Sequence, residues 1–315
     1  MPAPELFQAA LDGDRSALAR LLSLIERGDE EAREIGRLAY PRSGAGYTVG
    51  LTGAPGAGKS TLTSAIIKHL RSLELDIAVL AIDPSSPFTG GAILGDRVRM
   101  QDHATDPGVF IRSMATRGHL GGLSLATPEA VRALDAIGRR WILVETVGVG
   151  QVEVEVAGKA DTTIVVVNPG WGDSVQANKA GLMEIADIFV INKADRKGVD
   201  ETRRDLMQML DLSDLSHDAW RPPILNTTGT TGEGVIELWD TVLEHREFAE
   251  KSGLLQERRT FRLREELREI IAQRLGRRAR LICTGRRWDE LTNEVAALTT
   301  DPWTAADEML AAIDA

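Results

Sequence analysis

The stretch Gly53-Ala-Pro-Gly-Ala-Gly-Lys-Ser-Thr61 fits the pattern G-x-x-x-x-G-K-[ST] and decides how the surrounding chain folds. The apolar run Tyr47–Thr52 before it predicts a β-strand, and the amphipathic stretch Ser60–Leu73 after it predicts a helix. A strand, a glycine turn and the start of a helix aim several backbone N–H groups at one point, where a chain of phosphates can sit. Gly53 and Gly58 permit the tight turn because they carry no Cβ. We therefore interpret the stretch as a phosphate-binding loop.

Two side chains of this loop carry chemistry. Lys59 can reach the oxygens of a β- and a γ-phosphate, and the Ser60 hydroxyl can coordinate Mg²⁺. We predict a catalytic role for Lys59 and a metal-ligand role for Ser60. The nucleotide-binding residues expected in the loop are Gly53, Ala54, Gly56, Ala57, Gly58, Lys59, Ser60 and Thr61.

The composition limits which partners are possible. A formal net charge of −10 argues against nucleic acid as the main partner, because phosphate contacts need clustered cations. One basic cluster is present, and we interpret it as a solvated helix face or a subunit contact. It consists of Arg274, Arg277, Arg278, Arg280, Arg286 and Arg287. Cys283 is the only cysteine, which excludes an internal disulfide framework and a multi-cysteine metal site.

No feature of the sequence predicts export or a membrane. The start of the chain lacks the basic and apolar regions of a signal peptide. No apolar run approaches the roughly 20 residues that span a bilayer. We expect a soluble, cytoplasmic protein.

The order of predicted elements indicates the fold class. Most predicted strands are near-continuous apolar runs, typical of strands covered by helices on both faces. The full set of predicted strands is 47–52, 77–82, 109–113, 141–146, 162–168, 188–192 and 224–225. Alternation of strands and helices predicts an α/β, mostly parallel, doubly wound sheet of the P-loop NTPase class. Ligands of such sheets bind beyond the carboxyl ends of the strands.

Helical additions are expected at both ends of the chain. Residues 5–40 predict two or three short helices with breaks at Asp12-Gly13-Asp14 and Gly28-Asp29. After residue 251 a helix with an apolar stripe is expected, then a helix near Trp288 and another after Asp301-Pro302. The predicted domains are an N-terminal extension (1–46), a nucleotide-binding domain (47–250) and a helical C-terminal arm (251–315).

The motif Asn192-Lys-Ala-Asp195 ends an apolar strand and indicates the base that is bound. The Asp195 carboxylate can accept two N–H bonds from the N1 and N2 edge of guanine, and adenine cannot donate that pair. Each charge-assisted bond contributes roughly 1.5–3 kcal/mol, so the motif favours GTP and GDP. We expect Asn192 to brace the phosphate loop and the Lys193 stem to lie along the purine. Asn226 and Thr227 are predicted as a second wall of the pocket.

Acidic residues at strand ends could complete a magnesium site. Glu145 ends the strand 141–146, where a metal-binding acid is expected, and the N–H of Gly148 could sense the γ-phosphate. Mg²⁺ prefers oxygen ligands in octahedral geometry. Asp83 and Asp96 could join Ser60 and Glu145 at this site. Spacing alone leaves the role of Asp83 and Asp96 open, because an acidic residue that caps a helix would occur in the same sequence pattern.

A glycine-rich segment after the fifth predicted strand has two interpretations. Residues 168–179 contain two glycines together with Asp173 and Lys179. This composition suits a mobile loop near the phosphates, but the sequence alone slightly favours a surface turn.

Together these residues resemble the cobalamin-linked GTPase chaperones of the MeaB, ArgK and human methylmalonic aciduria type A group. The resemblance extends from about residue 5 to the C-terminus. The matching segments are Gly53–Thr61, Asp83–Ser86, Thr89–Gly91, Ile93–Asp96, Arg117–Gly122, Val144–Gln151 and Asn192–Asp195.

The resemblance implies several properties that the residues alone do not. It implies that Asp83, Asp96 and Glu145 surround Mg²⁺ with Ser60, and that Asp83 and Lys179 take part in catalysis. It implies switch loops containing Asp96, Glu145, Gln151, Asp173 and Lys179. It also implies a homodimer formed by the arm. The implied role is to gate delivery of adenosylcobalamin to an acyl-CoA mutase, such as methylmalonyl-CoA mutase or a relative, and to protect that mutase.

The expected reaction is slow hydrolysis of GTP to GDP and phosphate, accelerated by the partner. Lys59, the loop amides and Mg²⁺ would stabilise the transferring phosphoryl group. Gln151 lies three residues past Gly148, so we do not assign it the role of positioning water. Three alternatives remain: a metallochaperone GTPase, a P-loop kinase of a small molecule or transport-linked protein, and a non-enzymatic scaffold.

Overall fold

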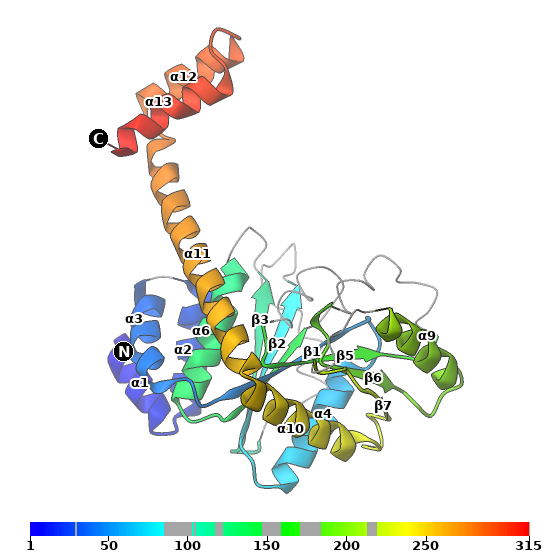
Figure 1. Cartoon of the computed structure of the whole chain (residues 1–315). Helices are drawn as coiled ribbons and strands as arrows, with labels where there is room; N and C mark the ends of the chain where they lie inside the picture. Colours follow the sequence, from blue (N-terminus) through cyan, green and yellow to red (C-terminus); the bar gives the residue numbers. More distant parts are fainter. Residues whose placement is uncertain are drawn as a thin grey trace. The chain divides into compact units, whose positions relative to one another are not determined.

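The computed structural model describes residues 1–28, 30–84, 103, 105–116, 122–146, 159–170, 184–212 and 219–314. The chain divides into two compact units, Met1–Thr260 and Phe261–Ala315. The first unit holds a seven-stranded sheet with helices on both faces (Figure 1).

All neighbouring strands of the sheet are parallel, in the order β3-β2-β4-β1-β5-β6-β7. They are β1 (Tyr47–Gly53), β2 (Ile77–Pro84), β3 (Val109–Thr116), β4 (Trp141–Thr146), β5 (Thr162–Val167), β6 (Ile188–Asn192) and β7 (Ile224–Thr227). β2 and β3 lie on one side of β1, the chain then returns to place β4 beside β1, and β5, β6 and β7 follow on the other side. Ligands of such sheets bind at the carboxyl ends of the strands where the strand order reverses, here near the end of β1. The predicted doubly wound P-loop fold is confirmed.

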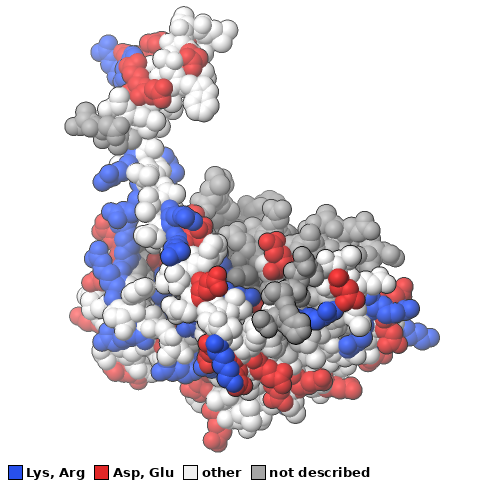
Figure 2. All heavy atoms as spheres, in the orientation of Figure 1, with Lys and Arg blue, Asp and Glu red and all other residues white. Residues whose placement is uncertain are grey.

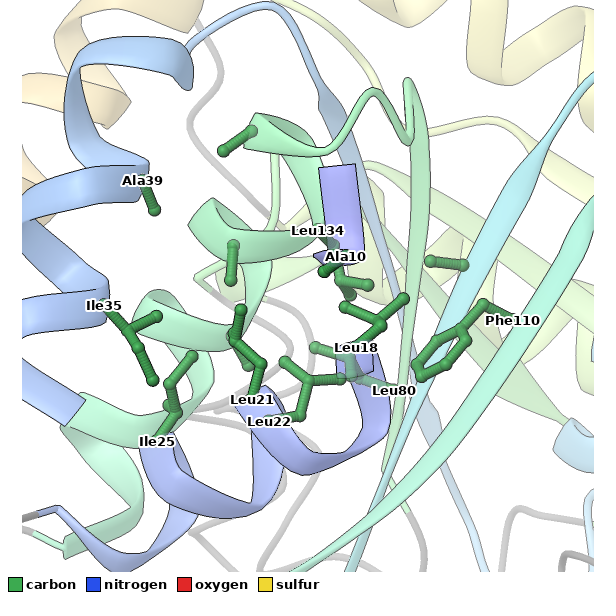
Figure 3. Packing of buried hydrophobic residues seen from close by; sticks show 14 of the residues in the cluster. Ala10, Leu18, Leu21, Leu22, Ile25, Ile35, Ala39, Leu80, Phe110 and Leu134 are labelled. Carbon is green, nitrogen blue, oxygen red and sulfur yellow. The ribbon is translucent and has the colours of Figure 1, made fainter. Parts of the chain in front are cut away.

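One face of the sheet is covered by helices from two regions of the chain. These are α6 (Gly122–Ala136) and the N-terminal helices α1 (Ala3–Leu11), α2 (Arg15–Arg27) and α3 (Glu30–Ala39), followed by the 3₁₀ turn Tyr40–Arg42. Figure 3 shows Leu18 and Leu22 of α2 beside Leu80 of β2, Phe110 of β3 and Leu134 of α6. The N-terminal helices therefore share one core with the sheet. On the same face, α9 (Val199–Asp211) packs on β5 and β6.

The opposite face is covered by α4 (Lys59–Ser72) and α10 (Val235–Ser252). Alternate residues of the central strands point to this side. Trp239 of α10 packs edge-on against Trp141 of β4, with ring centroids 4.7 Å apart. Because both faces are covered, the strands are apolar almost throughout, as the sequence predicted.

The predicted breaks between the N-terminal helices have clear local causes. Asp14 caps α2, because its Oδ1 accepts hydrogen bonds from the N–H groups of Ser16 (2.8 Å) and Ala17 (3.1 Å). Gly28 ends α2 in the left-handed conformation at φ 68°.

The first turns of α11 (Leu254–Ile282) are tied to the amino ends of β5 and β6. Arg258 donates to both carboxylate oxygens of Asp187 (3.0 and 2.9 Å), and Arg259 donates to both oxygens of Asp161 (3.1 and 2.7 Å). Arg259 also donates to the carbonyl oxygens of Gly44 and Gly46. These contacts explain why residues up to Thr260 belong to the first unit. The predicted domain boundaries at 46 and 250 remain a prediction.

The second unit is helical. It contains the remainder of α11 and the helices α12 (Arg286–Ala296) and α13 (Pro302–Asp314), which pack through Leu291, Ala305 and Met309. Basic side chains gather along α11 (Figure 2), where Arg274, Arg277, Arg278 and Arg280 are exposed.

Candidate nucleotide-binding site

Two glycines give the loop between β1 and α4 its shape. Gly53 has φ 135°, and a Cβ there would lie 1.9 Å from the carbonyl oxygen of Val166 in β5. Gly58 has φ 90°, and a Cβ there would lie 2.5 Å from Nδ2 of Asn192. No other residue fits either position, since both the backbone conformation and the close approach exclude a side chain.

Lys59 and Ser60 begin α4, and both are buried. The Lys59 ammonium donates to the carbonyl oxygens of Gly53 (2.8 Å) and Ala54 (3.2 Å), so it lies over the loop. The Ser60 hydroxyl donates to Oε1 of Glu145 at 2.6 Å. Glu145 lies in β4 and pairs in register with Leu51 of β1 and with Ala81 of β2.

A hydroxyl and a carboxylate in contact at the start of α4 fit the preference of Mg²⁺ for oxygen ligands. Two of the four predicted metal ligands, Ser60 and Glu145, are thus brought together. Asp83 lies in β2, next to β4, and pairs in register with Ala115 of β3. Asp96 lies outside the described residues.

The guanine motif is joined to the phosphate loop by hydrogen bonds. Asn192 donates through Nδ2 to the carbonyl oxygen of Ala57 (2.8 Å). Its Oδ1 accepts from the Thr227 hydroxyl (3.1 Å) and from the N–H of Gly229 (3.0 Å). Lys193 donates through Nζ to the carbonyl oxygen of Gly56 (2.6 Å). Asn192 therefore holds the phosphate loop and the end of β7 in one assembly.

The remaining predicted base-pocket residues lie at the same end of the sheet. Asp195 follows β6 and is exposed. Thr227 is buried against Asn192, whereas Asn226 is exposed and its Oδ1 accepts a hydrogen bond from Nη2 of Arg203 in α9 (3.0 Å). Sequence reasoning missed Arg203, because no spacing links a helix-surface arginine to a residue 23 positions away.

Several predicted residues lie outside the described part of the chain, so their predicted roles remain predictions. They are Asp96, Gly148, Gln151, Asp173 and Lys179. The described residues contain no cluster of three or more His, Cys, Asp or Glu side chains arranged to hold a metal. Within the same ranges, no helix combines the length and the apolar character that a bilayer crossing requires.

The fold and this site define the chain as a P-loop protein of the GTPase class. A family model described as "Methylmalonyl Co-A mutase-associated GTPase MeaB" matches residues 18–282, and the chain belongs to that family. The resemblance predicted from the sequence motifs is thereby confirmed.

Individual relatives agree with this assignment. A putative GTPase of Pyrococcus abyssi is 53% identical over 308 residues, 97% of this chain and 95% of that protein. The mitochondrial methylmalonic aciduria type A homolog of Mus musculus is 35% identical over 271 residues, 81% of this chain and 65% of that protein. The crystal structure of a LAO/AO transport system kinase superposes with a TM-score of 0.73 at 28% identity, covering 99% of this chain and 98% of that one.

Proposed function

We propose that this MeaB-family GTPase uses Mg²⁺ and slow GTP hydrolysis to gate the delivery of adenosylcobalamin to an acyl-CoA mutase, and that it protects that mutase from inactivation. The proposed partner is methylmalonyl-CoA mutase or a relative. The proposed active form is a homodimer in the cytoplasm. The observation that carries the proposal is the family match over 18–282, whose description names a mutase-associated GTPase.

The described residues suit the proposed chemistry. The loop amides and Lys59 surround the place where a β- and γ-phosphate would lie, and charge that develops on a transferring phosphoryl group is stabilised by such donors. Bound Mg²⁺ would neutralise phosphate charge, held by Ser60 and Glu145. Asn192, the first residue of the guanine motif, donates to the carbonyl oxygens of Ala57 and Gly58 in the phosphate loop, so one nucleotide could contact both segments.

A partner-dependent rate is the central expectation. The test measures release of phosphate from GTP with the full chain alone, and then with a purified adenosylcobalamin-dependent acyl-CoA mutase. We expect slow turnover alone and a rise of at least tenfold with the mutase. Turnover of about ten per second or more without a partner would contradict the slow-timer role.

Association with the mutase is tested separately by pull-down with GDP and with a non-hydrolysable GTP analogue. We expect capture that differs between the two nucleotides. Equal capture, or none, with every candidate mutase would contradict the gating role.

A kinase is the second candidate, since the structure that superposes with a TM-score of 0.73 is that of a LAO/AO transport system kinase. A kinase needs an acceptor that receives the γ-phosphate. Labelled γ-phosphate distinguishes the two functions: the proposed GTPase releases it as inorganic phosphate, and a kinase transfers it to an acceptor. The metallochaperone alternative gains no support from the described residues, which offer no cluster of metal ligands.

A further inference from the structure

The second compact unit separates its charges along the chain. Residues 270–287 contain six arginines and no acidic residue, whereas residues 288–315 contain seven acidic residues and no lysine or arginine. The first segment covers the distal half of α11 and the start of α12, and the second covers the rest of α12 and all of α13. Basic side chains therefore gather on α11 and acidic ones on the two helices that follow it (Figure 2).

Only part of this charge is paired within the chain. Arg287 pairs with Glu308 at 2.5 Å and ties α12 to α13. Arg274 and Arg278 of α11 are exposed and form no ion pair with any residue that the structure describes. The same holds for Asp307 of α13. These three charges are available to a partner.

One face of α11 is both apolar and basic. Leu267, Ile271, Arg274, Arg278 and Leu281 follow one another at spacings of three or four residues, so they lie on the same side of the helix. All five are exposed, Leu281 by 77%. No acidic residue belongs to this set. Two copies of this face placed against each other in register would oppose arginines with arginines, and such like-charge contacts are costly.

The outer face of α13, the side turned away from α12, is apolar and acidic. Trp303, Asp307 and Leu310 lie on one side of the helix, at spacings of four and three residues. Trp303 is 83% exposed and Leu310 is 48% exposed, whereas Ala305 and Met309 are buried against α12. The face of α11 and the outer face of α13 therefore match in apolar character and are opposite in charge.

We propose that the homodimer forms through a reciprocal contact, in which the outer face of α13 of one copy lies on the Leu267–Leu281 face of α11 of the other. This inference rests on the homodimer named in the proposed function, and it assigns the surfaces that form it. Asp307 lies near the middle of α13 and Arg274 near the middle of the α11 face, so the two charges meet when the helices are aligned. A two-fold axis repeats the contact, and each copy supplies one basic and one acidic face.

Analytical ultracentrifugation of the full chain over a range of concentrations measures the dissociation constant of the dimer. Asp307→Arg places a cation opposite arginines, and we expect the dimer to bind at least tenfold more weakly. The double variant Arg274→Glu with Arg278→Glu places acids opposite Asp307 and has a similar effect. All three substitutions in one chain reverse both sides of the contact, and the dissociation constant returns to within about threefold of the unmodified value.

Two further variants complete the design. Trp303→Ala removes the largest apolar side chain of the α13 face and should weaken the dimer about tenfold. Glu265→Arg is the matched control, since it makes the same charge change as Asp307→Arg on the side of α11 away from the proposed contact. Glu265 is exposed and pairs with Arg268 of its own helix, and such surface pairs contribute little. This control leaves the dissociation constant within twofold.

The outcomes separate the inference from the function on which it rests. A dimer that is unchanged by both Asp307→Arg and Trp303→Ala overturns the reciprocal contact and leaves the homodimer standing. An effect of the arginine substitutions without an effect of Asp307→Arg also overturns it, because another surface would then cover α11. Failure of the triple variant to restore the dimer shows that the charges do not face each other. An unmodified chain that is monomeric at every concentration overturns the proposed homodimer itself.

Discussion

At the scale of single residues, we propose that guanine recognition depends first on the carboxylate of Asp195, which is exposed. We predict that Asp195→Asn lowers the affinity for GDP by at least a hundredfold, because two charge-assisted bonds of roughly 1.5–3 kcal/mol each are lost. The new amide can donate to a carbonyl at C2, so binding of xanthosine diphosphate increases. Isothermal titration with GDP and xanthosine diphosphate measures both changes. An unchanged guanine preference would remove Asp195 from the pocket.

A substitution at Ser60 tests the predicted metal site without removing a residue of the apolar core. Ser60 is buried and donates to Glu145, and its hydroxyl is the first metal ligand that the phosphate-loop motif predicts. Ser60→Ala should weaken GDP binding about tenfold or more in the presence of Mg²⁺ and much less in EDTA, because only the metal-dependent part is lost. Titration with GDP at two Mg²⁺ concentrations measures the difference. Ser72→Ala, which removes an exposed hydroxyl at the other end of α4 and leaves Ser60 intact, is the control. An equal loss with and without Mg²⁺ would exclude Ser60 as a ligand.

The residues that were predicted from the sequence share one property. Each belongs to a short motif whose residue types are explained by the group that the motif is expected to contact. Lys59 was predicted to contact phosphate, Ser60 to bind a metal and Asn192 to brace the loop. The structure places all three at the phosphate loop or the start of α4. Arg203 and Arg258 were missed because their partners lie 23 and 71 positions away, and such contacts depend on how elements pack.

At the scale of elements, the helices and strands were predictable where local chemistry decides them. The strand 141–146 was predicted to the residue, because an apolar run ends there beside glycine-rich sequence. β7 extends two residues past the predicted 224–225. Pairing with β6 keeps Asn226 in the strand although asparagine has a low strand preference, and Thr227 follows it. The attachment of α11 to the sheet was not predictable, because paired charges of this kind leave no periodic pattern.

That attachment gives a stability prediction. Arg259 holds Asp161, which is nearly fully buried, and it donates to two carbonyl oxygens as well. Arg259→Ala should lower the free energy of unfolding by about 2–3 kcal/mol, somewhat below the roughly 3–5 kcal/mol for breaking a fully buried pair. Urea unfolding measures the change. Arg264→Ala, an exposed arginine further along α11, should stay within about 0.5 kcal/mol of the unmodified chain. Equal effects of the two variants would contradict the role of the pair.

The ion pair between Arg258 of α11 and Asp187 predicts how the free energy of unfolding depends on pH. Burial alone would raise the pKa of Asp187, but hydrogen bonds from His245 and Arg258 outweigh it and hold the pKa below its ordinary value. Because the pKa of Asp187 is lower in the folded than in the unfolded state, its ionised form stabilises the folded protein. This contribution is fully present above the unfolded pKa of about 3.9, and it is lost as the pH falls through the folded-state pKa. Urea unfolding between neutral pH and about pH 3 should show the loss. The loss of unfolding free energy at acid pH should be smaller in Asp187→Asn. It should be the same as in the unmodified chain in Asp200→Asn, a control at an exposed position. An equal acid slope in all three proteins would exclude Asp187 as a contributor.

At the scale of the whole molecule, the helical arm carries apolar surface that a monomer would leave in water. Four side chains at spacings of four residues on α11 are between 44% and 58% exposed. They are Leu263, Leu267, Ile271 and Leu275. Burying a side chain of this kind contributes roughly 1.5–3 kcal/mol, enough in sum to offset part of the cost of association. The stripe therefore fits the proposed homodimer.

A charge placed in the stripe should break that dimer. We expect the unmodified chain to have the mass of a dimer in light scattering at micromolar concentration, and Leu267→Glu to have the mass of a monomer. GDP affinity should not change, because the nucleotide site lies in the other compact unit. Ala272→Glu adds the same charge at an exposed position off the stripe of the same helix, and it should remain dimeric. A monomeric unmodified chain would contradict the proposed homodimer, whereas a dimeric Leu267→Glu would place the subunit contact elsewhere and leave the apolar stripe to another partner.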